Sequence, residues 1–329
     1  MLANNKNILV TGGAGYIGSH TCKYLSLSGF NPIVYDNFTT GHKKFIKWGD
    51  YIEGNIGDKN SFSYALKKYN PIAIIHFAGI SSVKESIDKP KKYHNENVKS
   101  FENMIDVIQE FGVKNFIFSS SAAVYSSDSG MPLTENSKLS PITPYGQNKV
   151  DIENILKNLE LKQKIKYVIL RYFNATGADL DCEVGELHDP ETHLIPNLIN
   201  SQINNKTAYI YGNDYKTSDG TTVRDYIHVY DLAIGHIKAL NYLLENKESN
   251  IFNLGSGKGY SILKIIKVFK NLNLDIKYEF LPRREGDIAE LIADITKAKK
   301  ILGWLPINSE IETIISTAYK WHRKISSGE

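Results

Sequence analysis

The chain has 329 residues, enough for one large or two modest domains with a sizeable core. Hydrophobic residues make up 42% and charged residues 23%, as in ordinary globular proteins, and no apolar run approaches the roughly 20 residues that span a bilayer. A formal net charge of +3 with scattered lysines argues against a nucleic-acid partner. Two cysteines, Cys22 and Cys182, give no disulfide framework. With no signal peptide before the first apolar run, we expect a reducing, cytoplasmic setting.

Residues 1–173 alternate short apolar runs with helical patterns. The runs at 7–11, 32–36, 51–53, 73–77, 115–119 and 167–172 predict strands, and the stretches 16–28, 59–68, 93–111 and 145–161 predict helices. This alternation is typical of an α/β protein with a Rossmann-type, doubly wound parallel sheet. Ligands of such sheets bind beyond the carboxyl ends of the strands.

The pattern loosens after residue 174. Residues 175–193 predict a loop, 194–203 and 229–244 helices, and 208–211, 222–228 and 251–254 strands, followed by three helices and one strand in the tail from residue 260. We expect the segment 222–254 to rejoin the first domain, 1–173. Residues 174–221 and 255–329 then form a smaller C-terminal α/β domain that caps it and binds substrate.

Residues 11–18 read TGGAGYIG between the first strand and the first helix. Strand, glycine turn and helix together are the context of a dinucleotide-binding motif. Gly12 can make the tight turn, Gly15 lets the backbone approach a pyrophosphate, and Gly18 lets the helix pack on the strand. The helix N-terminus then offers free N–H groups to the phosphates.

Asp36 is the first acidic residue of the chain and ends the second predicted strand. A carboxylate there can accept hydrogen bonds from an adenosine ribose and would repel a 2′-phosphate, which favours NAD over NADP. The simpler interpretation of a lone glycine motif is an ordinary loop. The strand, the helix and the acid at this spacing make the NAD interpretation the stronger one.

Tyr145 and Lys149 lie four residues apart at the start of a predicted helix, so both side chains share one face. A nearby ammonium lowers the pKa of a phenol from about 10, which would make Tyr145 a usable general base. Ser121 can supply a hydroxyl to the same substrate oxygen; alternatively, the serine run 119–121 is a polar strand end. The same Tyr-x-x-x-Lys spacing recurs in two pairs that we interpret as exposed helix pairs, Tyr64/Lys68 and Tyr260/Lys264.

Several longer blocks resemble one family over essentially the whole chain. They are TGGAGYIGSH, the pair DN at 36–37, HFAG at 76–79, NFIFSSSAAVY at 115–125, PYGQNK at 144–149, LRYFNATGA at 170–178, GNDYKTSDGTTVRDYIHVYDLA at 212–233, FNLGSGKGYS at 252–261 and PRREGD at 282–287. This text resembles the extended short-chain dehydrogenase/reductases, and within them the UDP-glucose 4-epimerase family.

The resemblance implies site residues. Tyr145 would be the catalytic base, with Lys149 and Ser121 as its partners. The cofactor residues would be Gly12, Gly15, Tyr16, Ile17, Gly18, Asp36, Asn37, Asn55, Ile56, Phe77, Ala78, Gly79, Ser81, Asn97, Ser119, Tyr145, Lys149 and Phe173. The UDP-sugar residues would be Ser121, Tyr145, Asn174, Leu194, Tyr211, Arg224, Arg284, Asp287 and Leu291. Asn55 replaces the usual aspartate of the family and Ser81 a lysine found in some relatives.

Two arginines suit a diphosphate, because each guanidinium offers a bidentate fork. Alternatively, Arg224 pairs with Asp225, and Arg284 belongs to a solvated face. The implied reaction inverts C4 of a UDP-hexose through a 4-keto sugar. Tyr145 takes the proton of the 4-hydroxyl, and NAD takes the hydride and returns it to the other face of the sugar.

Rival activities depend on a few positions. Dehydratases and decarboxylating relatives carry acids where this chain has Ala122 and Ala123, which cannot protonate a leaving group. A non-enzymatic NAD-sensing module would be expected to have lost Tyr145 or Lys149, and a sugar-nucleotide dehydrogenase would release NADH. Leu291 occupies a position that is a bulky tyrosine in relatives restricted to glucose and galactose. We therefore hypothesise activity on UDP-GlcNAc and UDP-GalNAc too; alternatively, Leu291 is simply a wall residue.

The nine histidines show no metal-ligand spacing, so we expect no metal. His76 and His228 lie in apolar runs and are interpreted as core residues. Residues 97–111 and 145–161 carry apolar stripes wider than one sheet face needs, and relatives pair these helices across a two-fold axis. The expected partners are therefore a UDP-sugar and a second copy of the chain, without a membrane or nucleic acid.

Overall fold

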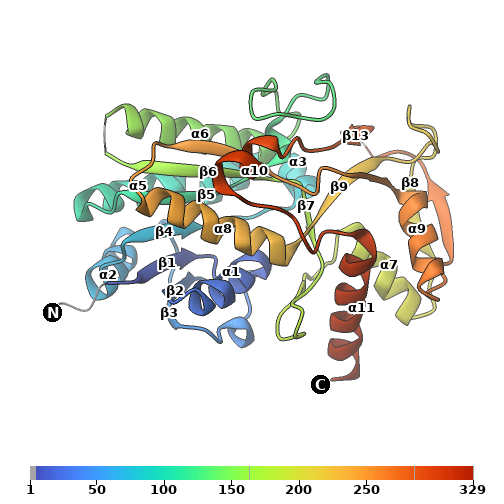
Figure 1. Cartoon of the computed structure of the whole chain (residues 1–329), viewed down its shortest axis with the longest axis horizontal. Coiled ribbons are helices and arrows are strands. Elements are labelled where there is room, and N and C mark those ends of the chain that lie inside the picture. Colours follow the sequence, from blue (N-terminus) through green and yellow to red (C-terminus); the bar gives the residue numbers. More distant parts are fainter. Residues whose placement is uncertain (1–4, 163, 285, 329) are drawn as a thin grey trace.

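The computed structural model describes residues 5–162, 164–284 and 286–328. Its main sheet has seven parallel strands in the order β10-β6-β5-β4-β1-β2-β3 (Figure 1). The bounds are β1 Asn7–Thr11, β2 Asn31–Asp36, β3 Asp50–Glu53, β4 Ala73–His76, β5 Asn115–Ser121, β6 Lys166–Tyr172 and β10 Asn250–Leu254. The chain runs outward from β1 to β3 and then returns to β4 on the other side of β1. This reversal is the switch point of a doubly wound fold, which confirms the predicted fold class.

The two faces of this sheet are buried separately, as period-2 alternation requires. Ile8 and Val10 of β1 pack with α1 (Tyr16–Leu27), α8 (Val229–Leu244) and α10 (Thr296–Leu302). Leu9, between them, faces α2 (Lys59–Tyr69), α5 (Ser100–Phe111) and α6 (Pro144–Leu161). Cys22 lies on the first of these faces with 2% of its surface exposed, as a small buried residue of that core.

A smaller region lies at the opposite end of the molecule from α2 and α5 (Figure 1). Its four-stranded sheet joins β7 (Asn174–Thr176), β9 (Val223–His228), β11 (Gly259–Ser261) and β13 (Glu290–Leu291), and a two-stranded sheet joins β8 (Ala208–Tyr211) to β12 (Tyr278–Leu281). The helices α7 (Leu194–Ile203), α9 (Ile262–Asn271) and α11 (Ile311–Ser327) surround a core of their own. β9 belongs to this region, whereas α8 and β10 return to the main sheet.

The helix predicted at 93–111 is confirmed, but its first part is not regular α-helix. The structure has α4 (Pro90–Tyr93), then a π-helical segment η2 (His94–Lys99), and only then α5. An unpredicted helix, α3 (Val83–Asp88), precedes them, and the Ser82 hydroxyl caps it by accepting from Glu85 N at 3.2 Å. Hydrophobic periodicity misses both features because π segments arise from local packing and short helices carry too few apolar positions.

The interpretation of the second Tyr-x-x-x-Lys copy was also wrong. Tyr64 is 58% exposed on α2, as expected, but Tyr260 lies in β11, is only 8% exposed, and belongs to the core of the smaller region. Two short 3-10 turns complete the described elements, η1 (Lys43–Phe45) and η3 (Ala122–Val124).

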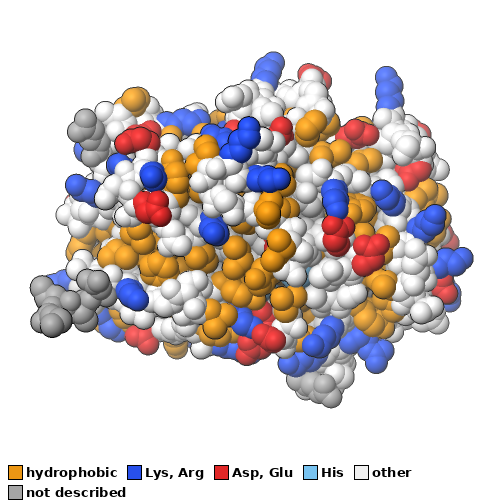
Figure 2. Space-filling model, in the orientation of Figure 1, with side chains coloured by type: hydrophobic (Ala, Val, Ile, Leu, Met, Phe, Trp, Pro, Cys, Tyr) orange, Lys and Arg blue, Asp and Glu red, His pale blue; other side chains and the backbone are white. Residues whose placement is uncertain are grey.

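The surface carries mixed charge. On the face in Figure 2, Lys and Arg side chains are interspersed with Asp and Glu and with hydrophobic residues rather than gathered in one patch. Among the described residues, no helix is both long enough and apolar enough to cross a membrane.

Candidate active site

A cavity of about 620 Å³ opens at the carboxyl ends of the main-sheet strands, over the switch point. Each strand that ends there contributes the residues that follow it, as predicted for a doubly wound sheet. The cavity is lined by Gly12, Gly15, Tyr16, Ile17, Gly18, Asp36, Asn37, Asn55, Ile56, Phe77, Ala78, Gly79, Ser81, Ser119, Ser121, Tyr145, Lys149, Phe173, Asn174 and Leu194. Every predicted cofactor residue except Asn97 is among them.

The glycine turn has the shape that a pyrophosphate requires. Gly12 has a φ of +72°, and a Cβ there would lie 2.6 Å from the backbone N of Ala78. At Gly18 a Cβ would lie 2.2 Å from the carbonyl O of Gly12, so only glycine lets α1 approach the turn this closely. No side chain caps the N-terminus of α1, and no acid occupies its first turn. The N–H groups there remain available to an anion.

Asp36 ends β2 at the same cavity and is 7% exposed. Its carboxylate accepts hydrogen bonds from Ala14 N at 3.0 Å and Phe38 N at 2.9 Å, which fix its orientation. Burial raises the pKa of this carboxyl, and the backbone donors oppose that shift. A carboxylate oxygen has further lone pairs, so the site fits ribose hydroxyls. The pocket therefore fits NAD at both its phosphate and ribose ends.

Asn97 lies behind the cavity rather than in its lining. Its side-chain Oδ1 accepts from Ile80 N at 2.9 Å, and its Nδ2 donates to Ile80 O at 3.0 Å. The amide thereby holds the loop after β4, of which Phe77 to Ser81 line the cavity. Asn97 is thus a positioning residue from the π-helical segment in this structure.

Tyr145 stands at the start of α6, where Thr143 is the N-cap and Pro144 the first helical residue. Lys149 follows one turn later, and its ammonium donates to the carbonyl O of Ser119 at 2.8 Å. The same Nζ lies 5.5 Å from the centroid of the Tyr145 ring. Sequence spacing therefore predicted this juxtaposition correctly.

We predicted that the Lys149 ammonium lowers the pKa of Tyr145, and for the protein without bound NAD this direction was wrong. Burial raises the pKa of Tyr145 to about 12, and a hydrogen bond with Ser121 opposes the shift only in part. Burial also lowers the pKa of Lys149 to about 8, against the attraction of Glu153. The ammonium is hydrogen-bonded to Ser119 rather than to the phenol, so desolvation dominates both groups.

Glu153 continues the same face of α6 and anchors it to β6. Its carboxylate accepts from Arg171 Nε at 2.9 Å and Nη2 at 2.7 Å, and from the Ser120 hydroxyl at 2.7 Å. Arg171 is 1% exposed and also donates to the Tyr125 hydroxyl at 3.0 Å. This bidentate buried pair holds the face of α6 that carries Tyr145 and Lys149 against β5 and β6.

A second cavity of about 210 Å³ adjoins the first. The two share Val83, Ser121, Tyr145, Tyr172, Phe173 and Asn174. Ala122, Ala123, Arg224, Asp287 and Leu291 line only the second. The space beside Tyr145, Arg224 and Leu291 is thus continuous with the larger cavity that the glycine turn lines.

The two predicted arginines differ in their surroundings. Arg224 Nη2 lies 3.5 Å from Asp287 Oδ1, whereas Asp225 is buried and accepts from Ser256, Gly257 and Ala293. The alternative pairing of Arg224 with Asp225 was therefore wrong. Arg284 is exposed and stacks on the Tyr211 ring at 3.8 Å from its centroid, and neither residue lines the cavities of this structure.

The histidines divide into two groups. His76 bonds the Thr11 hydroxyl at 2.7 Å, and His228 bonds Thr317 at 3.0 Å; both are at most 2% exposed, so their core interpretation is confirmed. His188 and His193, by contrast, line the large cavity. Sequence reasoning missed them because they lie in the predicted loop 175–193, where no periodicity marks which side chains face inward.

Fold and site together define a dinucleotide-binding enzyme of the short-chain dehydrogenase/reductase type. Residues 8–255 match the model of the NAD dependent epimerase/dehydratase family. The chain is 41% identical over 326 residues to the UDP-glucose 4-epimerase of Rhizobium meliloti (strain 1021), covering 98% of this chain and 99% of that protein. It therefore belongs to this family, and within it to the UDP-glucose 4-epimerase group.

Solved structures agree with this assignment. UDP-glucose 4-epimerase from Brucella ovis in complex with NAD has a TM-score of 0.93 and 43% identity, covering 96% of this chain and 98% of that one. UDP-glucose 4-epimerase from Bifidobacterium longum in complex with NAD⁺ and UDP has a TM-score of 0.93 and 36% identity, covering 98% and 100%.

Proposed function

We propose that the chain is an NAD-dependent epimerase that interconverts UDP-glucose and UDP-galactose by inverting C4 through a transient 4-keto sugar. One observation carries the proposal: Tyr145 and Ser121 line both cavities, so a single base faces the NAD-shaped space and the space beside Arg224. The family match and the NAD-bound relatives support the cofactor and the reaction.

In this proposal the role of each residue follows from its position in the site. The glycine turn and Asp36 would hold NAD, which would supply reversible hydride transfer at C4 of the sugar. The phenolic oxygen of Tyr145 takes the proton of the 4-hydroxyl and gives it back. Ser121 hydrogen-bonds the same oxygen, and its own hydroxyl is oriented by Ala123 N at 3.1 Å. The ammonium of Lys149, 5.5 Å from the Tyr145 ring, favours the phenolate.

Arg224 is placed to bind the diphosphate, and Arg284 with Tyr211 approaches from the exposed side in this proposal. Ala122 and Ala123 occupy the wall of the second cavity, where dehydration would need an acid to expel a leaving group. Two methyl groups cannot donate a proton, so the site favours return of the hydride over elimination.

The test is Tyr145→Phe, with Tyr64→Phe as the matched control, because Tyr64 heads the exposed copy of the same motif. Loss of a general base costs about 10²- to 10⁴-fold in rate. We expect kcat on UDP-galactose to fall by at least about 10²-fold in Tyr145→Phe and to be unchanged in the control, with NAD content equal in both. Normal turnover in Tyr145→Phe would place the base elsewhere.

A second candidate activity rests on Leu291, which lines the second cavity with Ser121 and Tyr145. The side chain is half-buried and is smaller than the tyrosine of restricted relatives, so we infer that an N-acetyl group fits beside it. We expect the purified protein to interconvert UDP-GlcNAc and UDP-GalNAc, and Leu291→Tyr to lose that activity while keeping turnover of UDP-galactose. Activity on the plain sugars alone would reject this second activity.

Three further expectations remain predictions. The division into a cofactor domain, 1–173 with 222–254, and a UDP-sugar cap, 174–221 with 255–329, is one, and the cytoplasmic location is another. The third is the homodimer through α5 and α6.

The apolar residues of α5 from Phe101 to Ile108 are buried inside their own chain, so the apolar stripe that we expected to remain for a partner is absent there. Phe111 (41% exposed) and Leu161 (82%) are the large exposed apolar residues of these two helices.

A further inference from the structure

The loop that leads into α7 gathers two imidazoles and two carboxylates that the proposed reaction does not use. They belong to Glu186, His188, Glu191 and His193, and one donor atom from each lies within 4.8 Å of all the others. The spacing Glu-x-His-x-x-Glu-x-His matches none of the helical or paired motifs by which metal sites are read from sequence. The loop conformation alone brings the four side chains together.

The donor atoms lie close enough together for one ion to contact all four side chains. His188 Nδ1 lies 3.1 Å from Glu186 Oε1 and 3.9 Å from Glu191 Oε2. His193 Nδ1 lies 3.5 Å from Glu191 Oε1 and is hydrogen-bonded to Glu186 Oε1. Zinc bonds of about 2.0–2.2 Å at tetrahedral angles require neighbouring donors to be about 3.3–3.6 Å apart. Both imidazoles present the same nitrogen, Nδ1, to the two carboxylates.

Glu186 supplies an independent sign of a missing ligand. Its side chain is only 2% exposed, and its Oε2 is buried with no hydrogen-bond partner among the described residues, although Oε1 of the same carboxylate accepts from both histidines. A buried carboxylate oxygen without a donor is costly. A cation held by both oxygens of the Glu186 carboxylate would satisfy it.

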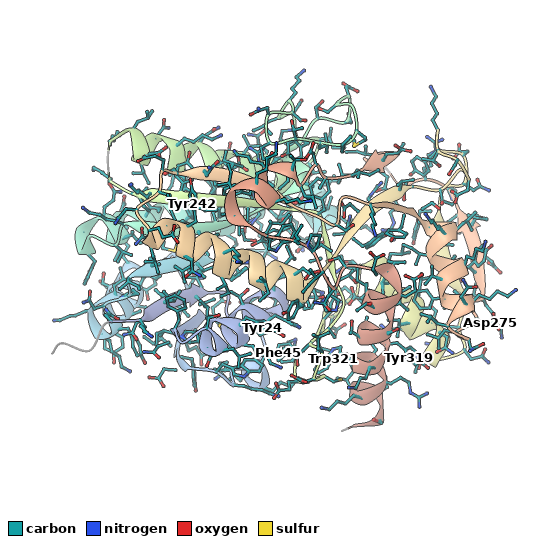
Figure 3. All side chains as sticks on the ribbon, in the orientation of Figure 1. Tyr24, Phe45, Tyr242, Asp275, Tyr319 and Trp321 are labelled. Atoms are coloured by element: carbon teal, nitrogen blue, oxygen red, sulfur yellow. The ribbon has the colours of Figure 1, made fainter. Side chains whose placement is uncertain are left out.

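The surrounding structure holds this loop in place. A Cβ on Gly185 would lie 2.5 Å from the Trp321 ring, and Trp321 Nε1 donates to the Glu186 carbonyl at 2.8 Å. Trp321 on α11 lies beside Phe45, with ring centroids 5.9 Å apart (Figure 3). His42 Nε2 donates to the Leu187 carbonyl at 2.9 Å. Such outer contacts are what fix the ligands of a metal site.

A neighbouring group of three carboxylates differs from the Glu186 group in that a lysine pairs with it. Asp179, Asp181 and Glu183 also approach one another, but the Lys23 ammonium lies 2.8 Å from a carboxylate oxygen of each. That group already has its cation. Among the described residues the Glu186 group has no Lys or Arg partner, and its ion pairs are with its own two imidazoles.

We propose that Glu186, His188, Glu191 and His193 form a zinc site. Four imidazole and carboxylate ligands suit Zn²⁺, and two carboxylates with two neutral imidazoles balance its charge. Four protein ligands leave no open position, so the ion is structural. Zinc displaces the protons that the imidazoles hold and releases them to water. Because His193 is the N-cap residue of α7 and Leu194 lines the large cavity, the ion fixes the rim of the active site.

The test uses the full chain, stripped of metal with a chelator and titrated with Zn²⁺ by calorimetry. The variants are His188→Ala, whose side chain is 31% exposed, and the conservative Glu191→Gln. The matched control is Glu183→Gln in the neighbouring Lys23 group. We expect one Zn²⁺ per chain, affinity at least tenfold weaker in both ligand variants, and unchanged affinity in the control. Circular dichroism of the metal-free forms checks that all four proteins are folded.

Cobalt gives a second readout that does not depend on activity. Co²⁺ bound to the stripped wild-type chain should show the intense visible absorption of a tetrahedral ion, and His188→Ala should weaken it. Absence of saturable Zn²⁺ binding in the wild type would overturn the proposal. So would binding of equal strength in the folded His188→Ala, Glu191→Gln and Glu183→Gln proteins.

Discussion

Burial of the Lys149 side chain determines the pH range over which this residue is charged. Lys149 is 9% exposed, and within the described part of the chain its ammonium donates only to the Ser119 carbonyl, at 2.8 Å. Burial therefore lowers its pKa to about 8, well below the ordinary value of about 10.4 for lysine. Lys149 therefore carries the full positive charge that favours the Tyr145 phenolate only at pH values below about 8.

The pH dependence of turnover follows from this shift. Because the folded-state pKa of Lys149 is lowered, its charge is lost as pH rises through about 8, and kcat should fall over that range. The measurement is kcat on UDP-galactose from pH 6 to 10, with NAD retention followed in parallel. Lys149→Arg keeps its charge to high pH, so any residual activity should lack the alkaline limb. The same limb in both proteins would assign it to another group.

At the residue scale, the sequence predicted which side chains lie close together better than it predicted how their pKa values are shifted. The spacing of Tyr145 and Lys149 was enough to put them on one face of a helix. The direction of the pKa shift depends on how deeply both groups are buried and where the ammonium donates, and neither is visible in the sequence. The same holds for His188 and His193, whose meeting with Glu186 depends on the path of a loop.

In the glycine turn between β1 and α1, the start of the helix lies so close to the turn backbone that there is no room for a side chain at Gly18. At Gly18 an added methyl would have to occupy a point 2.2 Å from the Gly12 carbonyl, which is backbone and cannot swing away. Gly18→Ala should therefore push α1 off the turn, destabilise the fold by about 1–3 kcal/mol and weaken NAD binding.

Gly130→Ala is the matched control, since a Cβ there meets nothing within 4 Å. Thermal unfolding and NAD content after purification measure the two effects. We expect a lower melting temperature and reduced NAD only in Gly18→Ala. Equal NAD retention in both variants would mean that the turn tolerates a side chain and that its shape does not select glycine.

Elements with strong local signals were predicted, and those that depend on neighbours were not. β1, α7, α8 and β8 have the predicted bounds because apolar periodicity and turn residues mark both ends. β5 extends to Ser121, two residues beyond its predicted end, because Ser120 and Ser121 still pair with Arg171 and Tyr172 of β6. The π-helical segment η2 has no signature in the sequence, although its Asn97 amide positions the cavity wall.

The whole molecule places the chemistry at the junction of its two regions. The large cavity follows the switch point of the main sheet, and the second cavity adds Arg224, Asp287 and Leu291 from the smaller region. The fold class and most of the cofactor-side lining could be predicted because they follow strand ends. The meeting of residues from β5, α6, β9 and β13 around Tyr145 depends on how the two regions pack. For these residues the sequence offered only the resemblance to a family.

The central claim is that one bound NAD serves a reaction with no net oxidation. The most direct measurement adds UDP-galactose to the purified protein without free cofactor and follows the sugar product and the absorbance of reduced nicotinamide together. We expect many equivalents of UDP-glucose per chain while reduced nicotinamide never exceeds the protein concentration. Release of NADH in proportion to the sugar consumed, with no UDP-glucose formed, would contradict the account and indicate a dehydrogenase.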